Sequence, residues 1–295
     1  METELTRPQW LRAAAEHEDR AARWVRPHLE RRRAGQKHPV WDFLFDYYRL
    51  RPSQLSRWHP GLGTALLDAT TAPASPTTGW RDYRVDERGT ARLDTGALLA
   101  HRGEGLRQVR ALVASIGGAQ PHFGCFGLHE WAMLYRTDAP RHGLPLRLGA
   151  EGTNRVVESH QLKCSHFDAY RFFTPAARPL NQTVLTREGQ AGSDQPGCVH
   201  ATMDLYKWAS TVGPVTPGDL LLDCFELAAK ARRLDMEASP YDCRGLGFGV
   251  VAIETAEGKA EYVRRQRELA AEAEPLRVRL VALLDALFAD SMTSR

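Results

Sequence analysis

Helical spacing of apolar residues over several long segments is the feature that most constrains the fold of this chain. Over residues 8–33, Trp10, Ala21 and Val25 belong to a set of apolar side chains that recur roughly at helical steps. Further helices are expected over residues 96–116, 217–236, 258–273 and 275–289. A pattern repeated over so much of the chain predicts a mainly α-helical protein.

The segments between these helices indicate turns and a little β-structure. The run TTAPASPTTG, at residues 70–79, has no side chains that could bury a face, so we expect a flexible exposed loop. The next run, at 80–94, alternates around a turn and predicts a β-hairpin. A helix beginning near Pro39 and a strand over GVVAIET, at 249–255, are also expected. We therefore predict a single helical domain over 1–295, with a small β-hairpin and a long irregular central region.

Composition limits the compartment and the partners. A chain of 295 residues, 43% of them hydrophobic, can bury a sizeable core. No stretch approaches the ~20 apolar residues of a membrane span, and the first residues lack the layout of a secretory signal. The five cysteines are odd in number and sparse, which favours reduced thiols over a disulfide framework. We expect a cytoplasmic protein with no membrane partner, and a net charge of +3 does not require nucleic acid.

Three short clusters combine cysteine, histidine and a carboxylate. They are CFGLHE at 125–130, CSHFD at 164–168 and CVHATMD at 198–204. Imidazole, thiolate and carboxylate groups bind zinc and iron in proteins, which makes His129, His166 and His200 candidate metal ligands. These clusters predict a metal-dependent enzyme, such as an oxygenase or a hydrolase, acting on a small molecule. Alternatively, the cysteines fill a core as small hydrophobes beside hydrogen-bonded histidines.

Acid–base chemistry without a metal is a second interpretation of the same clusters. Glu130, Asp168 and Asp204 stand near aromatic residues in the sequence, and a desolvated carboxylate has a raised pKa that suits it to proton transfer. The helical step between His200 and Asp204 places both on one face. Candidate substrate-binding residues are Trp131, Asn181, Arg187, Tyr206 and Trp208. The structural alternative is a helix that packs its aromatic residues inward.

Several runs together resemble a known group of proteins. The runs are HPVWDFLFDYYRLRPSQLSRWHPG, CFGLHEWAMLYR, CSHFDAYRFFTP, ARPLN, QPGCVHATMDLYKWA and LDMEASPYD. They resemble actinobacterial proteins that carry the name 3-methyladenine DNA glycosylase, over most of the chain from His38 to beyond Asp242. The resemblance implies a DNA-repair hydrolase that flips an alkylated base out of the duplex and cleaves its N-glycosidic bond.

The roles of individual residues follow from that resemblance. Trp131, Tyr206 and Trp208 would stack on the cationic methylated base. Glu130, Asp168 or Asp204 would stabilise the developing sugar cation or orient water.

Three common nucleotide-binding and hydrolase motifs are absent from the sequence. The run GLGFG matches neither a phosphate-binding loop nor a dinucleotide fingerprint, and no G-x-S-x-G elbow occurs. This weakens ATPase, dehydrogenase and α/β-hydrolase interpretations. Three hypotheses remain: a glycosylase acting on alkylated DNA, an enzyme using zinc or iron, and a non-catalytic helical binding module in which the clusters serve packing.

Overall fold

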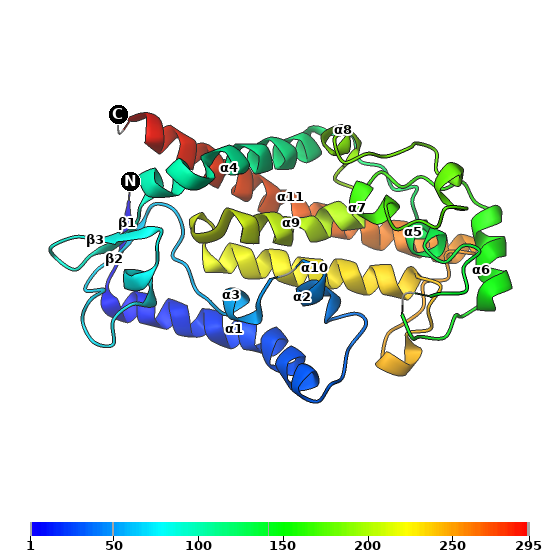
Figure 1. Ribbon diagram of the computed structural model, residues 1–295, viewed down its shortest axis with the longest axis horizontal. Helices are drawn as coiled ribbons and strands as arrows, with labels where there is room; N and C mark the ends of the chain where they lie inside the picture. Colours follow the sequence, from blue (N-terminus) through cyan, green and yellow to red (C-terminus); the bar gives the residue numbers. More distant parts are fainter. Residues whose placement is uncertain (1, 49, 141, 294–295) are drawn as a thin grey trace. The chain divides into compact units, whose positions relative to one another are not determined.

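The computed structural model describes residues 2–48, 50–140 and 142–293 (Figure 1). As predicted, the described chain is mainly α-helical, with a small four-stranded sheet. Its contacts divide it into two compact units, each built from separate stretches of sequence. Within the described residues, unit 1 comprises 2–48, 50–114, 206–225 and 276–293, and unit 2 comprises 115–140, 142–205 and 226–275.

Four long helices contribute residues to both units, and the other elements belong to one unit each. Unit 1 contains β1 (Thr3–Leu5), α1 (Arg7–Arg33), α2 (Phe43–Asp46), α3 (Pro52–Leu55), β2 (Thr64–Leu66), η1 (Pro76–Gly79), β3 (Tyr83–Val85), β4 (Ala91–Leu93) and η3 (Gly213–Val215). Unit 2 contains α5 (Leu128–Ala132), α6 (Gly149–Glu158), α7 (Phe167–Tyr170), η2 (Arg178–Leu180), α8 (Gln190–Ser193) and η4 (Arg244–Leu246). The elements shared by the two are α4 (Thr95–Gly118), α9 (Val199–Val212), α10 (Gly218–Ala238) and α11 (Ala256–Thr293).

Unit 1 packs the start of α1 on the sheet. The backbone N–H of Thr6 donates to Gln9 Oε1 at 2.8 Å, which caps the helix start. Trp10, one turn later, is buried in a cluster with Leu66, Ala69 and Ala91. The strand order is β1-β2-β4-β3, with β1 parallel to β2 and the other pairs antiparallel. The predicted hairpin is therefore confirmed as β3 and β4, while β1 and β2 were not predicted.

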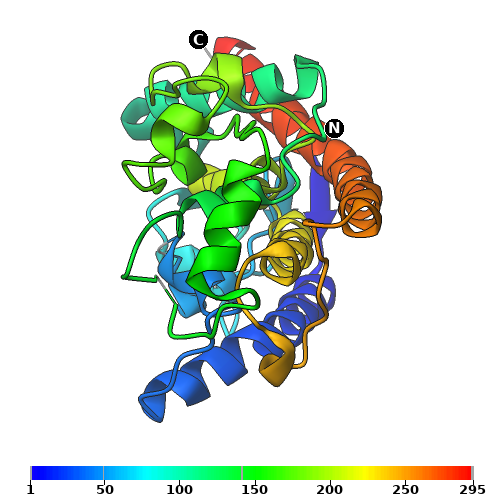
Figure 2. The same cartoon turned by 90° about the vertical axis from the view of Figure 1, so that its right-hand side faces the viewer.

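In unit 2, α10 and α11 run side by side (yellow and orange in Figure 2). Lys230 Nζ donates to Glu272 Oε2 at 2.6 Å, and Arg265 Nη1 donates to Glu237 Oε2 at 2.7 Å. The inner face of α10 is almost wholly buried and includes polar residues as well as apolar ones. That polar part of the helix positions the candidate site.

Three expected elements differ from the structure. The helix expected from Pro39 is only α2, because the Asp42 side chain accepts from the backbone of His38 and closes a turn there instead. Residues 249–255 form no strand, since backbone N–H groups of Gly249 and Val251 donate to Glu237 at the end of α10. The two C-terminal helices are one, α11, with Pro275 inside it, where the two units divide.

None of the described helices combines the length and the apolar character that crossing a bilayer requires.

Candidate functional site

The three sequence clusters come together in unit 2. His129 lies on α5, His166 stands directly before α7, and His200 is near the start of α9. The ring centroids of His129 and His200 are 4.4 Å apart, and those of His166 and His200 are 5.4 Å apart. All three imidazoles are buried. We call the assembly the histidine–carboxylate centre, which consists of His129, Glu130, His166, Asp168, Asp194, His200, Asp204, Arg232 and Asp235.

The loop before α9 fixes where that helix begins. Gln195 Oε1 accepts from the backbone N–H of His122 at 2.8 Å and of Gly197 at 2.7 Å. A Cβ at Gly197 would lie 2.6 Å from the carbonyl oxygen of His122, so only glycine fits this approach. In the first two turns of α9, His200 and Asp204 are both buried, as their four-residue spacing predicts.

One ring nitrogen of His166 is hydrogen-bonded to Asp194, and the other faces Asp204. Its Nδ1 is 2.9 Å from Asp194 Oδ1, and Asp194 Oδ2 in turn accepts from Gln190 Nε2 at 2.8 Å. Its Nε2 faces Asp204 Oδ2 at 3.7 Å. Burial opposes protonation of His166, but the hydrogen bond and charge of Asp194, together with the charge of Asp204, raise its pKa above 6.5.

Asp168 is oriented by two arginines from the same unit. Its Oδ1 accepts from Arg187 Nη2 at 2.7 Å and forms an ion pair with Arg171 Nε at 3.1 Å. The carboxylate is buried, whereas the side chain of Arg187 is 55% exposed and lies over the ring of Phe167. Arg187, a sequence candidate for substrate binding, thus directly contacts the centre.

Beside the network around His166, the centre contains a second network, in which His129, Asp235, Arg232 and Glu130 are joined by direct hydrogen bonds. His129 Nε2 is 2.7 Å from Asp235 Oδ1, and Arg232 Nη1 donates to Asp235 Oδ2 at 2.7 Å and to Glu130 Oε1 at 3.0 Å. Burial opposes ionisation of both partners, but their mutual attraction raises the pKa of His129 and lowers that of Asp235. Burial, with the nearby charge of Asp235, raises the pKa of Glu130 despite Arg232.

His200 lies beside both networks and has an unused nitrogen. Its Nδ1 is buried and has no hydrogen-bond partner among the described residues. Burial, followed by the charge of His129, lowers the pKa of His200 well below 6.5. The ring is therefore a neutral imidazole. An unmade hydrogen bond in such a buried place costs about 1–3 kcal/mol, which marks it as a position for a ligand or water.

Two groups of side chains bring possible metal-ligand atoms within 4.8 Å of one another. They are His129, His200 and Asp235, and His166, Asp168 and Asp204. Two ligand atoms bound at about 2.1 Å to one ion, at a tetrahedral angle, stand about 3.4 Å apart. The 3.7 Å between His166 and Asp204 approaches that spacing, whereas the 2.7 Å between His129 and Asp235 is that of a hydrogen bond. The second group is the better candidate metal site.

A cavity of about 650 Å³ in unit 2 adjoins the centre. Cys125 and Cys164 line it, and Cys125 Sγ is 3.4 Å from Nδ1 of His129. The other lining residues are His122, Phe123, Gly124, Lys163, Ser165, Gln182, Thr183, Leu185, Gly192, Ser193 and Gln195. Its size suits a small molecule.

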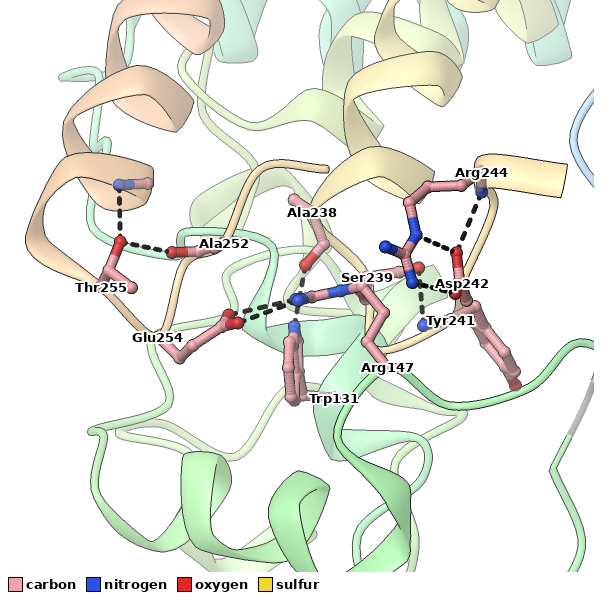
Figure 3. Close-up of polar contacts among 11 residues, drawn as sticks. Trp131, Arg147, Ala238, Ser239, Tyr241, Asp242, Arg244, Ala252, Glu254 and Thr255 are labelled. Carbon is pink, nitrogen blue, oxygen red and sulfur yellow. Dashed lines mark hydrogen bonds and ion pairs between the residues drawn. The ribbon is translucent and has the colours of Figure 1, made fainter. Parts of the chain in front are cut away.

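Trp131, a sequence candidate for substrate binding, is a fully buried packing residue (Figure 3). Its Nε1 donates to the carbonyl of Ala238 at 2.9 Å. The guanidinium of Arg147 lies 5.6 Å from its ring and pairs with both carboxylate oxygens of Glu254. These contacts fix the indole and leave it no face on the cavity.

The remaining candidates also have packing or positioning roles. Tyr206 packs edge-on against Tyr48 and Phe225 within unit 1, and Trp208 of the same unit lies under the Lys207 ammonium. Asn181 clamps the backbone of Cys164, accepting from its N–H at 2.8 Å and donating to its carbonyl at 3.0 Å.

Sequence reasoning missed Asp194, Arg232 and Asp235. The last two stand on α10 at helical spacing from buried alanines such as Ala228, so charged residues within an apolar stripe were the available signal. Asp194 follows the short helix α8 in a stretch without periodicity, and nothing local distinguishes it. Comparisons with protein families, with curated proteins and with solved structures gave no match.

Proposed function

We propose that His166, Asp168 and Asp204 bind a divalent transition metal, zinc or iron, and that the protein is a metal-dependent enzyme acting on a small molecule. The observation that carries the proposal is the setting of His166. One ring nitrogen is fixed by Asp194, and the other faces the Asp204 carboxylate at 3.7 Å, close to the spacing of two ligands on one ion. Metal-binding histidines in proteins are commonly fixed through a carboxylate in this way.

The ligand set favours catalysis over a structural role. Structural zinc sites use four protein ligands, whereas catalytic sites keep a position for water or substrate. Three ligands with two carboxylates would balance a divalent charge, and the metal would polarise a substrate carbonyl or lower the pKa of bound water. The unpartnered Nδ1 of His200, whose ring lies beside that of His166, could hydrogen-bond to such a water or substrate.

The adjoining cavity supports a small-molecule substrate. Cys164 and Ser165, which line it, directly precede His166 in the sequence. Cavities of 300–1,000 Å³ are typical for small ligands and cofactors. Lys163 lines the same cavity and would favour a substrate with negative or strongly polar character.

Metal analysis of the purified protein tests this proposal. Protein prepared without chelators should contain close to one zinc or iron ion per chain, and His166→Ala and Asp204→Asn should lose it while keeping native circular dichroism. His160→Ala is a matched control, because His160 lies in the same unit and outside the centre. Folded wild-type protein that contains no metal and takes up neither Zn²⁺ nor Fe²⁺ would overturn the proposal.

The glycosylase and the binding module stay predictions. A glycosylase needs aromatic walls open to a flipped base beside a carboxylate, whereas Trp131 is enclosed and Tyr206 packs against other aromatic rings. The contacts therefore support the metalloenzyme better. Release of base from alkylated duplex DNA, lost in Asp204→Asn, would favour the glycosylase instead.

A further inference from the structure

We propose that Cys125 is a nucleophilic thiol that attacks the carbonyl carbon of a small ester or thioester bound in the 650 Å³ cavity, with His129 as its proton acceptor and Asp235 orienting the imidazole. This activity is separate from the proposed metal site. None of these three residues belongs to the ligand set of His166, Asp168 and Asp204.

The three side chains form one hydrogen-bonded series. Cys125 Sγ lies 3.4 Å from His129 Nδ1, and His129 Nε2 lies 2.7 Å from Asp235 Oδ1. Arg232 donates to the other oxygen of Asp235 at 2.7 Å and so fixes the carboxylate. A nucleophile within reach of a base, with the base oriented by a third group, is the arrangement that activates serine and cysteine in hydrolases and transferases.

The backbone between Cys125 and α5 is shaped for this contact. Phe126 and Gly127 both have left-handed φ values, 51° and 72°. A left-handed conformation costs a non-glycine residue about 1–2 kcal/mol, so surrounding contacts must hold Phe126 in place. A Cβ at Gly127 would lie 3.2 Å from the ring of Tyr262 and 3.3 Å from Ala238 Cβ. This tight turn brings the Cys125 sulfur to the imidazole four residues later.

Nearby cysteines lack the same setting. Cys164 also lines the cavity, but its Sγ donates to the carbonyl of His166 at 3.5 Å. Burial raises the pKa of Cys164 and of Cys198, which keeps both as poorly reactive thiols. Cys125 is half-buried and is the one with an imidazole within hydrogen-bond distance among the cysteines of unit 2 in the described residues.

The reaction balances with water as the only further reactant. The Cys125 proton passes to His129 Nδ1, the sulfur forms a bond to the carbonyl carbon, and the bond from that carbon to the leaving oxygen or sulfur breaks. The leaving group takes the proton from His129. Water, deprotonated by His129, then hydrolyses the S-acyl bond, which releases a carboxylic acid and restores the thiol. Asp235, 2.7 Å from His129 Nε2, orients the imidazole and stabilises the imidazolium that forms.

The probe for this activity is p-nitrophenyl acetate. Wild-type protein should release a burst of one p-nitrophenolate per chain and carry acetyl on the peptide that contains Cys125. Cys125→Ser should lose the burst, and Cys164→Ser, a cysteine lining the same cavity, should keep it. His129→Gln should slow the burst by about 10²- to 10⁴-fold, the usual contribution of a positioned proton acceptor. The burst should persist after treatment with EDTA, which separates this result from that of the metal analysis.

A competition experiment covers the case in which His129→Gln does not fold. Native wild-type protein treated with limiting iodoacetamide should carry at least ten times more label on Cys125 than on Cys164, whereas protein unfolded in urea should label both alike. Equal native labelling of the two cysteines would overturn the proposal. So would an undiminished burst in Cys125→Ser, or acetyl found on Lys163 instead.

Discussion

Both units contain a buried histidine–aspartate pair, but the pairs differ in the further groups that they contact. In unit 1, Asp42 accepts from His28 Nδ1 at 2.8 Å, from Arg31 and from the backbone N–H of His38 at 2.7 Å, and the His28 ring stacks on Phe45. Every one of these contacts is to a residue that completes local packing. The carboxylate therefore serves to join α1 to the segment that follows it.

In unit 2 the second ring nitrogen of each paired imidazole faces another functional group. His166, paired with Asp194, faces Asp204, and His129, paired with Asp235, faces the Cys125 thiol at a cavity. A buried histidine–aspartate pair by itself therefore stabilises the fold. Its second ring nitrogen decides whether it can also support chemistry.

The largest expected effect is on stability in unit 2. Arg232→Met leaves the buried carboxylates of Glu130 and Asp235 without their shared cation, so the free energy of unfolding should fall by about 3–5 kcal/mol. Arg31→Met in unit 1 should cost less, about 1–2 kcal/mol, because Asp42 keeps two other donors. Urea denaturation measures both. Equal losses would show that the two arginines contribute alike to stability.

A smaller effect is expected on metal affinity. Asp194→Ala removes the acceptor that orients His166, so the dissociation constant for Zn²⁺ should rise about 10- to 100-fold. Asp194→Asn keeps an acceptor oxygen and should change the constant less. Competition with a chromogenic chelator gives the constants, and Asp42→Ala serves as the control in unit 1. An unchanged constant in Asp194→Ala would contradict the role given to this pair.

The smallest effect is a pH-dependent one in unit 1. Burial tends to raise the pKa of Asp42, but hydrogen bonds from Arg31 and His28 outweigh it and lower the pKa to about 2. A folded-state pKa below the unfolded value of about 3.9 stabilises the protein above pH 4, and this stabilisation is lost as the pH falls towards 2.

Asp42→Asn should therefore unfold more easily than wild type by about 1–2 kcal/mol above pH 4, after allowance for solvent screening, with the gap shrinking towards pH 2. Urea midpoints at several pH values measure the gap. Metal content should stay at the wild-type level. A gap that is constant with pH, or a loss of metal, would show that the two pairs are not separable in this way.

The sequence predicted the architecture better than the site. Apolar spacing over 8–33 and 217–236 identified α1 and α10, because burial of one helix face depends on local periodicity. The clusters at 125–130, 164–168 and 198–204 were visible in the sequence, and their histidines lie close together in the structure. Their partners Asp194 and Asp235 could not be predicted, since these contacts join residues 28 and 106 positions apart.

The same limit applies to the packing of the aromatic candidates. Trp131 and Tyr206 stand beside Glu130 and Asp204 in the sequence, yet neighbouring positions on a helix point in different directions. Their rings therefore pack away from the carboxylates, against Arg147 and against Tyr48. Strand β1 was missed because three residues carry too little alternation to be distinguished from a loop.

Anomalous diffraction at the zinc absorption edge, from crystals of protein loaded with Zn²⁺, locates a bound ion directly. We expect one strong peak at about 2.1 Å from His166 Nε2, with carboxylate oxygens of Asp168 and Asp204 at similar distances. A peak bound instead by His129 and Asp235, or no peak in unit 2, would contradict the proposed metal site.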